Sequence, residues 1–355
     1  LINATDISNI GEIKTSKQLA INANTINTTV NSLISAADTL HISGSGASNN
    51  DQATSLITNG DIISDKSLSI QTDLITNNGN LQSAGNLDIT AQTLSNAKNI
   101  QSNKQLNIIA NDITNQASAQ LSSIESLIIN GAVNNTADSL TNSGTISSKV
   151  LNLAATTLTN NGDAIITAET ADLTATTISN AGTLYQLESD TADAAFNISS
   201  QTLTNNDSNA TIDIKNGLFN LNTLINQGLI RERQDSSLDS DQLRLTNVKT
   251  LNNSGELILY NDLILTDASL INSGENAYIR TNSLTTNKLT DFSNSGKIAA
   301  QNVLTLNSEK ALTNQGELVA NQFTANTQQD FTNQGLVQAT TQLEINAQNI
   351  SNEAS

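Results

Sequence analysis

The sequence contains no cysteine, proline, methionine or tryptophan, and aromatic residues make up only 2% of its 355 positions. The absence of cysteine excludes disulfide frameworks, thiol catalysis and cysteine-based zinc sites. A globular core of this length normally depends on bulky aromatic side chains, so we expect a narrow, aliphatic core instead. No apolar run approaches the ~20 residues that a membrane-spanning helix needs.

Few side chains are available for catalysis or metal binding. His41 is the only histidine, and it begins a Gly/Ser/Asn-rich stretch that we expect to be a loop. Asp239 and Asp241 form an Asp-x-Asp, but a Ca²⁺ site needs six to eight oxygen ligands from several residues. No phosphate-binding loop or nucleotide fingerprint is present. We therefore expect no enzymatic activity, no cofactor and no metal site.

The charge balance is strongly acidic, with 15 Lys and Arg against 33 Asp and Glu and a formal net charge of −18. Such a chain lacks the cationic surface that displaces counterions from a phosphate backbone. We expect no nucleic-acid partner and no insertion of this segment into a membrane.

What the sequence does contain is a period. Of its 17 glycines, 11 follow an asparagine by two positions, and in all 11 cases Leu, Ile or Phe lies two positions before that asparagine. The phrase Thr-Asn-Gln-Gly occurs at Asn314 and again at Asn333, 333 − 314 = 19 residues later. Representative corner pairs are Asn77 and Gly79, Asn142 and Gly144, Asn160 and Gly162, Asn314 and Gly316, and Asn333 and Gly335.

The rest of the unit is patterned as well. Counting from Asn77, apolar residues fall at offsets 4, 10, 12, 14 and 17, and the same offsets recur from Asn96 and from Asn333. The alternation at offsets 10, 12 and 14 is typical of a strand, and no sustained helical stripe is present. A unit of this length cannot bury its own apolar face, whereas stacked units bury it against one another.

The period predicts an all-β fold, a parallel β-helix of about 17 coils of roughly 19–20 residues. We expect residues 1–355 to form a single elongated domain and, because the pattern starts abruptly, to be a segment of a longer chain. The recurring asparagines should form a hydrogen-bonded ladder between coils. We expect glycine at the corner because it adopts positive φ freely.

Departures from the period predict irregular or inserted regions near 41–52, 116–139, 187–211 and 231–242. Loops on a rigid scaffold are frequent sites of recognition, although a solvated loop explains the same charges. The last region contains the densest charge cluster and is the candidate binding site: Arg231, Glu232, Arg233, Asp235, Asp239 and Asp241.

The unit L-x-I-x-A-x-x-[LIF]-[TS]-N-x-G-x-[LI] resembles the haemagglutinin repeat of filamentous haemagglutinin and of CdiA-type contact-dependent growth inhibition proteins. Residues 87–102 and 343–355 carry the clearest resemblance. The resemblance implies a right-handed β-helix, secretion by an outer-membrane two-partner transporter, and a place outside the cell or at the bacterial surface. It also implies a structural and adhesive role, in which the segment presents or forms a region that binds a cell-surface receptor, for adhesion or for toxin delivery.

Two alternatives remain open. An autotransporter passenger adhesin would have similar coils but would carry its secretion unit in the same chain. A β-helix enzyme that cleaves acidic polysaccharides would use clustered carboxylates and arginine. Sugar grooves usually display aromatic residues, and this chain has three tyrosines, five phenylalanines and no tryptophan, so we favour the enzyme least.

Overall fold

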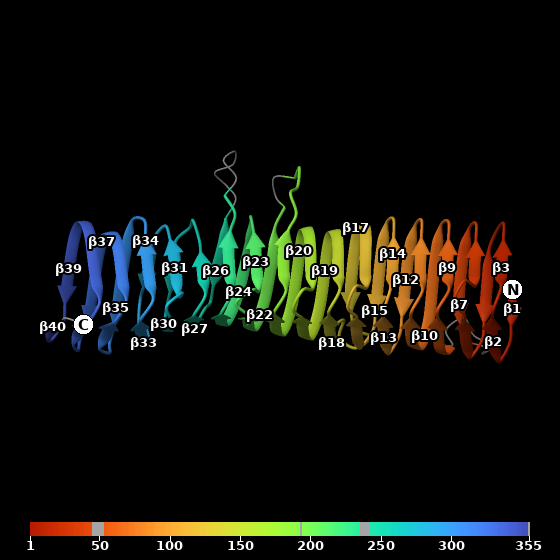
Figure 1. The fold of residues 1–355 in the computed structure, drawn as a ribbon, viewed down its shortest axis with the longest axis horizontal. Helices are drawn as coiled ribbons and strands as arrows, with labels where there is room; N and C mark the ends of the chain where they lie inside the picture. The colour runs from red at the N-terminus through yellow and green to blue at the C-terminus, as the bar shows by residue number, and fades with distance from the viewer. Residues whose placement is uncertain (45–52, 192–193, 235–241, 354–355) are drawn as a thin grey trace. The chain divides into compact units, whose positions relative to one another are not determined.

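The computed structural model describes residues 1–44, 53–191, 194–234 and 242–353. These residues form parallel strands stacked as a β-solenoid of about 17 turns, so the predicted fold class is confirmed. Figure 1 shows the coils following one another along each part of the chain. The described residues contain no helix, and hence none that could cross a membrane.

The chain divides into two compact units. The first comprises Leu1–Thr176 with Leu187–Ser189, and the second comprises Thr177–Gln186 with Asp190–Ser355. Strand β20 (Ile165–Asn180) contributes residues to both. The strands of the first unit are β1 (Ile2–Asn3), β2 (Asp6–Asn9), β3 (Glu12–Thr15), β4 (Leu19–Asn22), β5 (Thr25–Thr28), β6 (Leu33–Ala36), β7 (Thr39–Ser43), β8 (Ala53–Thr58), β9 (Asp61–Ser64), β10 (Ser67–Asn77), β11 (Asn80–Ser83), β12 (Asn86–Thr90), β13 (Thr93–Asn96), β14 (Asn99–Ser102), β15 (Gln105–Ile109), β16 (Asp112–Asn115), β17 (Gln120–Asn130), β18 (Ala137–Asn142) and β19 (Thr145–Asn160).

The second unit repeats the same coil. Its strands are β21 (Thr183–Gln186), β22 (Phe196–Asn205), β23 (Thr211–Ile214), β24 (Gly217–Asn226), β25 (Leu229–Glu232), β26 (Leu243–Thr246), β27 (Thr250–Asn253), β28 (Glu256–Ile258), β29 (Leu263–Leu265), β30 (Ala268–Asn272), β31 (Tyr278–Thr281), β32 (Leu284–Thr286), β33 (Leu289–Asn294), β34 (Lys297–Ala300), β35 (Val303–Ser308), β36 (Leu312–Asn314), β37 (Glu317–Thr327), β38 (Phe331–Asn333), β39 (Leu336–Asn346) and β40 (Ile350–Asn352).

One coil of the first unit shows how sequence becomes structure. After Asn77 the chain forms β11, β12 and β13, and each strand pairs in parallel with the strand 19 residues later. Leu81 therefore lies on Ile100 and Leu87 lies on Leu106. Similar side chains stack because residues at the same offset in successive coils are paired. Inward positions alternate with outward ones along each strand.

The core is the column of inward side chains that this stacking produces. Leu81, Leu87, Ile89 and Leu94 are each 0% exposed. Burying such a side chain contributes roughly 1.5–3 kcal/mol, and each coil repeats the gain against both neighbours. In the second unit phenylalanine enters the core, and Phe323 meets Phe331 edge to face with ring centroids 6.4 Å apart.

A buried asparagine ladder runs beside this core. In the first unit, the Nδ2 atom of each ladder asparagine donates to the Oδ1 atom of the next, from Asn77 through Asn96, Asn115 and Asn142 to Asn160, at 2.7–2.8 Å. The second unit has its own ladder at 2.7–2.9 Å, through Asn180, Asn205, Asn226, Asn253, Asn272, Asn294, Asn314, Asn333 and Asn352.

Threonine takes over the ladder position near the N-terminal end of the first unit. Thr28 pairs with Asn9, Thr58 pairs with Asn77, and the two hydroxyl oxygens lie 3.0 Å apart. A hydroxyl both donates and accepts, so it continues a column of amides. Asn27 and Asn59, the residues that the simple period would select, lie one residue away from that column.

The reason proposed for the corner glycines was wrong. Gly274 is the one described glycine that has positive φ. Gly79 and Gly316 are instead required by close packing, because a Cβ atom at either position would lie 1.9 Å from the carbonyl oxygen of the glycine one coil earlier. Gly162 has open space around it and needs neither explanation.

The predicted irregular regions contain more strand than expected. In the region 41–52, His41 to Ser43 belong to β7, and residues 45–52 lie outside the described part of the chain. Most of the region 116–139 is occupied by β17 and the start of β18. Its extra residues are divided between two corners, at 116–119 and 131–136, because spacing between asparagines gives the size of an insertion and not its position.

The other two predicted regions change in the same way. Strand β22 fills 196–205, which leaves 187–195 and 206–210 as connections. Arg231 and Glu232 end strand β25, so the insertion after it comprises 233–242. Residues 192–193 and 235–241 lie outside the described part.

The ladder generates a prediction for Asn96→Asp. Asn96 is fully buried, accepts from Asn77 and donates to Asn115 and to the carbonyl oxygen of Gln120. A carboxylate cannot donate, so it would face Asn115 Oδ1 as a buried, unpaired charge. We expect the free energy of unfolding to fall by roughly 3 kcal/mol or more, measured by urea denaturation at neutral pH.

Asn111→Asp is the matched control. Asn111 lies on the outside and donates to the side chain of Gln92 at 3.0 Å. A surface change of this kind should cost less than about 1 kcal/mol. Equal losses at the two positions would show that the buried ladder adds no specific stability.

Candidate functional site

Two insertions leave the same edge of the coil in the second half of the chain. Residues 187–195 connect β21 to β22, and residues 233–242 connect β25 to β26. Strand β23 pairs with β21 on one side and with β25 on the other. The two insertions therefore follow equivalent strands, with a single coil between them.

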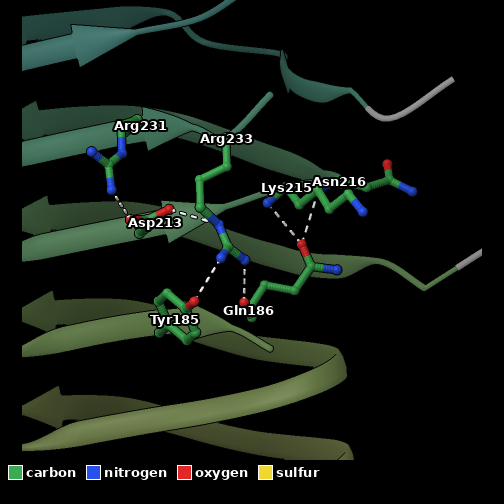
Figure 2. A network of polar contacts seen from close by, with 7 residues as sticks. All are labelled: Tyr185, Gln186, Asp213, Lys215, Asn216, Arg231 and Arg233. Atoms are coloured by element: carbon green, nitrogen blue, oxygen red, sulfur yellow. Dashed lines mark hydrogen bonds and ion pairs between the residues drawn. The ribbon is translucent and has the colours of Figure 1, made fainter. Parts of the chain in front are cut away.

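A network of polar side chains lies on these three strands (Figure 2). Asp213 of β23 has a side chain that is only 6% exposed, and it forms ion pairs with two arginines of the next coil. Arg231 Nη2 contacts Asp213 Oδ2, and Arg233 Nε lies 3.0 Å from Oδ1. Removing a carboxylate from water is costly unless it is paired, and two guanidinium groups offset that cost here.

The side chain of Arg233 also reaches past the coil of Asp213 to the coil that precedes it. Its Nη1 atom donates to the Tyr185 hydroxyl at 2.6 Å, and Nη2 donates to the carbonyl oxygen of Gln186. The guanidinium carbon lies 4.4 Å from the centre of the Tyr185 ring, a cation–π arrangement. One side chain thus joins three successive coils, a contact that the planar fork of arginine makes possible.

Gln186 closes the base of the first insertion. Its Oε1 atom accepts from the backbone nitrogens of Lys215 and Asn216, both at 2.9 Å. Its Nε2 atom donates to the carbonyl oxygen of Ala194, on the far side of the insertion, at 3.1 Å. The side chain is buried, so the two ends of 187–195 are held together by contacts shielded from water.

Glu232 performs the same task for the second insertion. It is 2% exposed and accepts from Tyr260 N at 2.6 Å and from Asn261 Nδ2 at 2.7 Å. It also accepts from the backbone of Leu243, where the chain returns from the insertion. Burial raises the pKa of the Glu232 carboxyl above its ordinary value, and the hydrogen bonds from Tyr260, Leu243 and Asn261 oppose that rise.

Both residues occupy a position that is serine in several regular coils of the first unit and is Leu259, Ala300 or Ala320 in later coils of the second. Gln186 and Glu232 lie six residues after Asn180 and Asn226, as Ser102 lies six residues after Asn96. The Ser102 hydroxyl donates to the carbonyl oxygen of Gln105 at 2.8 Å, across a tight corner. We call the two ends of an insertion, where it leaves and rejoins the strands, its neck. A longer side chain spans this wider gap.

The structure divides the predicted site residues. Arg231, Glu232 and Arg233 lie together, although Glu232 points inward and Arg231 has a side chain that is 44% exposed. Asp235, Asp239 and Asp241 lie outside the described residues. The sequence analysis missed four residues of this site: Tyr185, Gln186, Asp213 and Tyr260. The available signal was a long polar residue at offset six, Gln186 and Glu232, where regular coils have a short or apolar one.

The chemistry of this network is that of fixed charges. Asp213 and Glu232 are engaged by guanidinium, amide and backbone donors. In the part of the chain that the structure describes, no group of three or more His, Asp or Glu side chains could hold a metal ion. The arrangement holds Arg231 and both insertion necks in place, which suits recognition.

His41 is a strand residue and not the loop residue that was expected. It lies in β7 between Ala20 and Ser69 of the neighbouring coils. The side chain is half-buried, and this burial lowers the pKa of its imidazole.

A groove of about 570 Å³ crosses four coils of the second unit. One wall is a second row of asparagines, in which Asn346 donates to Asn326 and Asn326 donates to Asn307, both at 2.8 Å. Lys288 and Glu309 form an ion pair of 3.3 Å in the same groove. These polar groups largely satisfy one another, so the groove is a weaker candidate than the network around Arg233.

Glu232 gives a pH-dependent prediction. Because its folded-state pKa is raised above the ordinary value of 4.5, the folded state holds the proton more strongly than the unfolded state does. Stability should therefore decrease as the pH rises from about 4 towards 7, relative to Glu232→Gln, which lacks this titration. Unfolding midpoints of the two proteins across this range test it, and a difference independent of pH would contradict it.

Arg233→Lys should destabilise the second unit although it preserves the charge. A lysine ammonium cannot stack on Tyr185 while also reaching Asp213 and the carbonyl oxygen of Gln186. We expect a loss of about 1–3 kcal/mol in chemical denaturation, because a buried acceptor loses its partner. Arg244→Lys, at an exposed position of strand β26, is the control and should change stability by less than about 0.5 kcal/mol. Equal effects of the two substitutions would refute the bracing role of Arg233.

Comparison with known proteins gives one match. Residues 280–354 are similar to the haemagglutinin repeat family, and no characterised protein and no solved structure matches the chain. The matched segment covers β32 to β40, where the asparagine ladder has a regular spacing of 19–20 residues. The match supports a relation of these coils to filamentous haemagglutinin-type proteins.

Proposed function

We propose that this chain is an adhesive shaft segment of a large secreted bacterial exoprotein, with a recognition region around Arg231 and Arg233. A β-solenoid with haemagglutinin repeats fits a shaft-like adhesin segment. Proteins of this repeat family are secreted or exposed at the cell surface, which suggests an extracellular place for this chain. The proposed partner is a receptor on the surface of a target cell.

The observation that carries the recognition region is the bracing of the insertion necks. Regular coils have a short or apolar residue at offset six, such as Ser102 or Ala300, whereas here Gln186, Glu232 and Arg233 make buried polar contacts across successive coils. A rigid base reduces the conformational entropy that a surface connection loses when it binds a partner. Burying charged side chains costs free energy, so it is expected where the connection between two strands must be held in one position to bind a partner.

Secretion through an outer-membrane two-partner transporter belongs to the same proposal, and the role is not catalytic. An autotransporter passenger adhesin is the second candidate. Both fit a parallel β-solenoid that lacks disulfides, because a chain without cysteine can cross a membrane unfolded and stack coil by coil afterwards. A polysaccharide-cleaving enzyme has less support, because the carboxylates of Asp213 and Glu232 are committed to internal contacts.

Saturable binding of the purified chain to intact bacterial and epithelial cells tests the proposal. We expect the unchanged chain to bind one of the two cell types. Removal of 234–241 should reduce the affinity at least tenfold, since the insertion would no longer be presented. Removal of 131–136, a corner insertion in the first unit, is the control and should leave binding unchanged. Failure of the unchanged chain to bind either cell type would exclude an adhesive role.

Release of oligosaccharides from acidic glycans provides the opposing measurement. We expect none. Release that disappears in Arg233→Ala would favour the enzyme instead.

A further inference from the structure

The arginines and tyrosines of this chain are confined to one part of it. All four arginines lie between Arg231 and Arg280, and all three tyrosines lie between Tyr185 and Tyr278. Tyrosine and arginine are the residues most enriched where protein surfaces bind one another. Their confinement to about 100 of 355 positions calls for a reason beyond the stacking of coils.

These residues share one outward face in the second unit. Along β21, β23, β25, β28 and β31, one outward column reads Tyr185, Asp213, Arg231, Ile258 and Arg280. We call Tyr185, Arg231, Tyr260, Tyr278 and Arg280 the Tyr/Arg face. All five are half-buried, so each presents part of its surface to solvent.

The equivalent column of the first unit carries no arginine or tyrosine in its regular coils, where it reads Ile63, Gln82, Gln101 and Ser122. Gln82 donates to Gln101 at 3.3 Å, and Gln101 donates to Gln120 at 2.6 Å. Stacked amides satisfy one another and cost the fold nothing. The Tyr/Arg face therefore places Tyr185, Arg231 and Arg280 in a column that holds Gln82, Gln101 and Ser122 in the first unit.

The Tyr/Arg face is also the cationic surface of an acidic chain. Arg231 and Arg233 both form ion pairs with Asp213, whereas Arg280 makes no ion pair within the described residues. Glu256 is the exposed carboxylate of the neighbouring column, beside Tyr278. Arg280 thus presents a positive charge on a chain whose net charge is −18.

The rings show which kind of partner fits. Arg280 lies over Tyr260 with its guanidinium carbon 4.9 Å from the ring centre, as Arg233 lies over Tyr185 at 4.4 Å. A sugar that stacks on tyrosine needs an open ring face, and in Tyr185 and Tyr260 an arginine covers one face of the ring. The guanidinium of Arg280 makes no ion pair within the described residues, and its planar edge can bind a carboxylate in bidentate fashion.

We propose that the Tyr/Arg face docks an acidic surface of a protein, in which a carboxylate binds the edge of Arg280 and apolar side chains cover Tyr278 and Ile258. This inference rests on the proposed adhesive function and specifies its partner. Arg231 supplies a second cationic contact, two coils from Arg280 along the same column. The first unit has no equivalent surface because it has no arginine and no tyrosine.

The test uses the complete 355-residue chain and the same intact cells in four forms: untreated, proteinase-treated, periodate-treated, and treated with carbodiimide and ethanolamine to convert surface carboxylates to amides. We expect binding to survive periodate and to be lost after the other two treatments. Arg280→Ala should weaken binding at least tenfold, Arg280→Glu should abolish it, and added salt should weaken it.

The control variant is Gln82→Ala with Gln101→Ala, on the matching column of the first unit, which should bind as the unchanged chain does. Arg280→Lys retains the charge without the planar stack and should bind with intermediate affinity. Unfolding midpoints of all variants exclude loss of the fold as a cause.

Each other outcome has a definite meaning. Binding that Arg280→Ala and Arg280→Glu leave unchanged would overturn the docking face and keep the adhesive function. Binding that is lost after periodate but kept after proteinase would overturn a protein partner in favour of a glycan. Absence of binding by the unchanged chain would overturn both proposals.

Discussion

The structure depends on a hydrogen bond from one asparagine side chain to the asparagine of the next coil. Each ladder amide donates one hydrogen to the next coil, and its oxygen accepts from the coil before, as at Asn96. The second hydrogen reaches backbone carbonyl oxygens such as that of Gln120. A fully buried amide is tolerated only when all of these contacts are made, so the ladder fixes the register of neighbouring coils.

Because the ladder fixes one point of each coil, the remainder of the coil can vary. Successive ladder asparagines are 19 residues apart at Asn314 and Asn333 and 27 apart at Asn226 and Asn253, yet their hydrogen bonds measure 2.7 and 2.8 Å. Additional residues are expelled at corners, where they disturb no strand pair. A solenoid built in this way carries insertions without losing its stack, and recognition can evolve in them.

The sequence predicted the strands because their signal is local and repeated. The spacing of Leu81, Leu87 and Ile89 alone predicts that their side chains point inward. The structure has the coil that this spacing predicts. The corner glycines were predicted for the wrong reason, because the approach of the Gly60 carbonyl to Gly79 depends on the coil beneath. Spacing between Asn115 and Asn142 revealed an insertion but could not divide it between two corners.

The candidate site was predictable only in part, for the same reason. The charges at Arg231 and Arg233 were visible, but their partners lie 18 residues away at Asp213 and 48 away at Tyr185. Those separations combine an insertion with whole coils, so no fixed offset identifies them. Knowledge of the coil boundaries is needed before Asp213 can be placed beneath Arg231.

The outward columns show how polar side chains on the surface of the solenoid satisfy one another's hydrogen bonds. The Tyr/Arg face differs from these columns. Several outer rows of amides end on a carboxylate: Asn99 donates to Asn80 and Asn80 donates to Asp61, while Gln334 donates to Glu353. A carboxylate only accepts, so it ends such a row without leaving two donors opposed. Acidic residues thus complete the surface of a shaft, whereas arginine and tyrosine complete none of these rows. The proposed contact with an acidic protein surface would account for Arg280, whereas Arg231, Arg233 and Tyr185 also brace neighbouring coils.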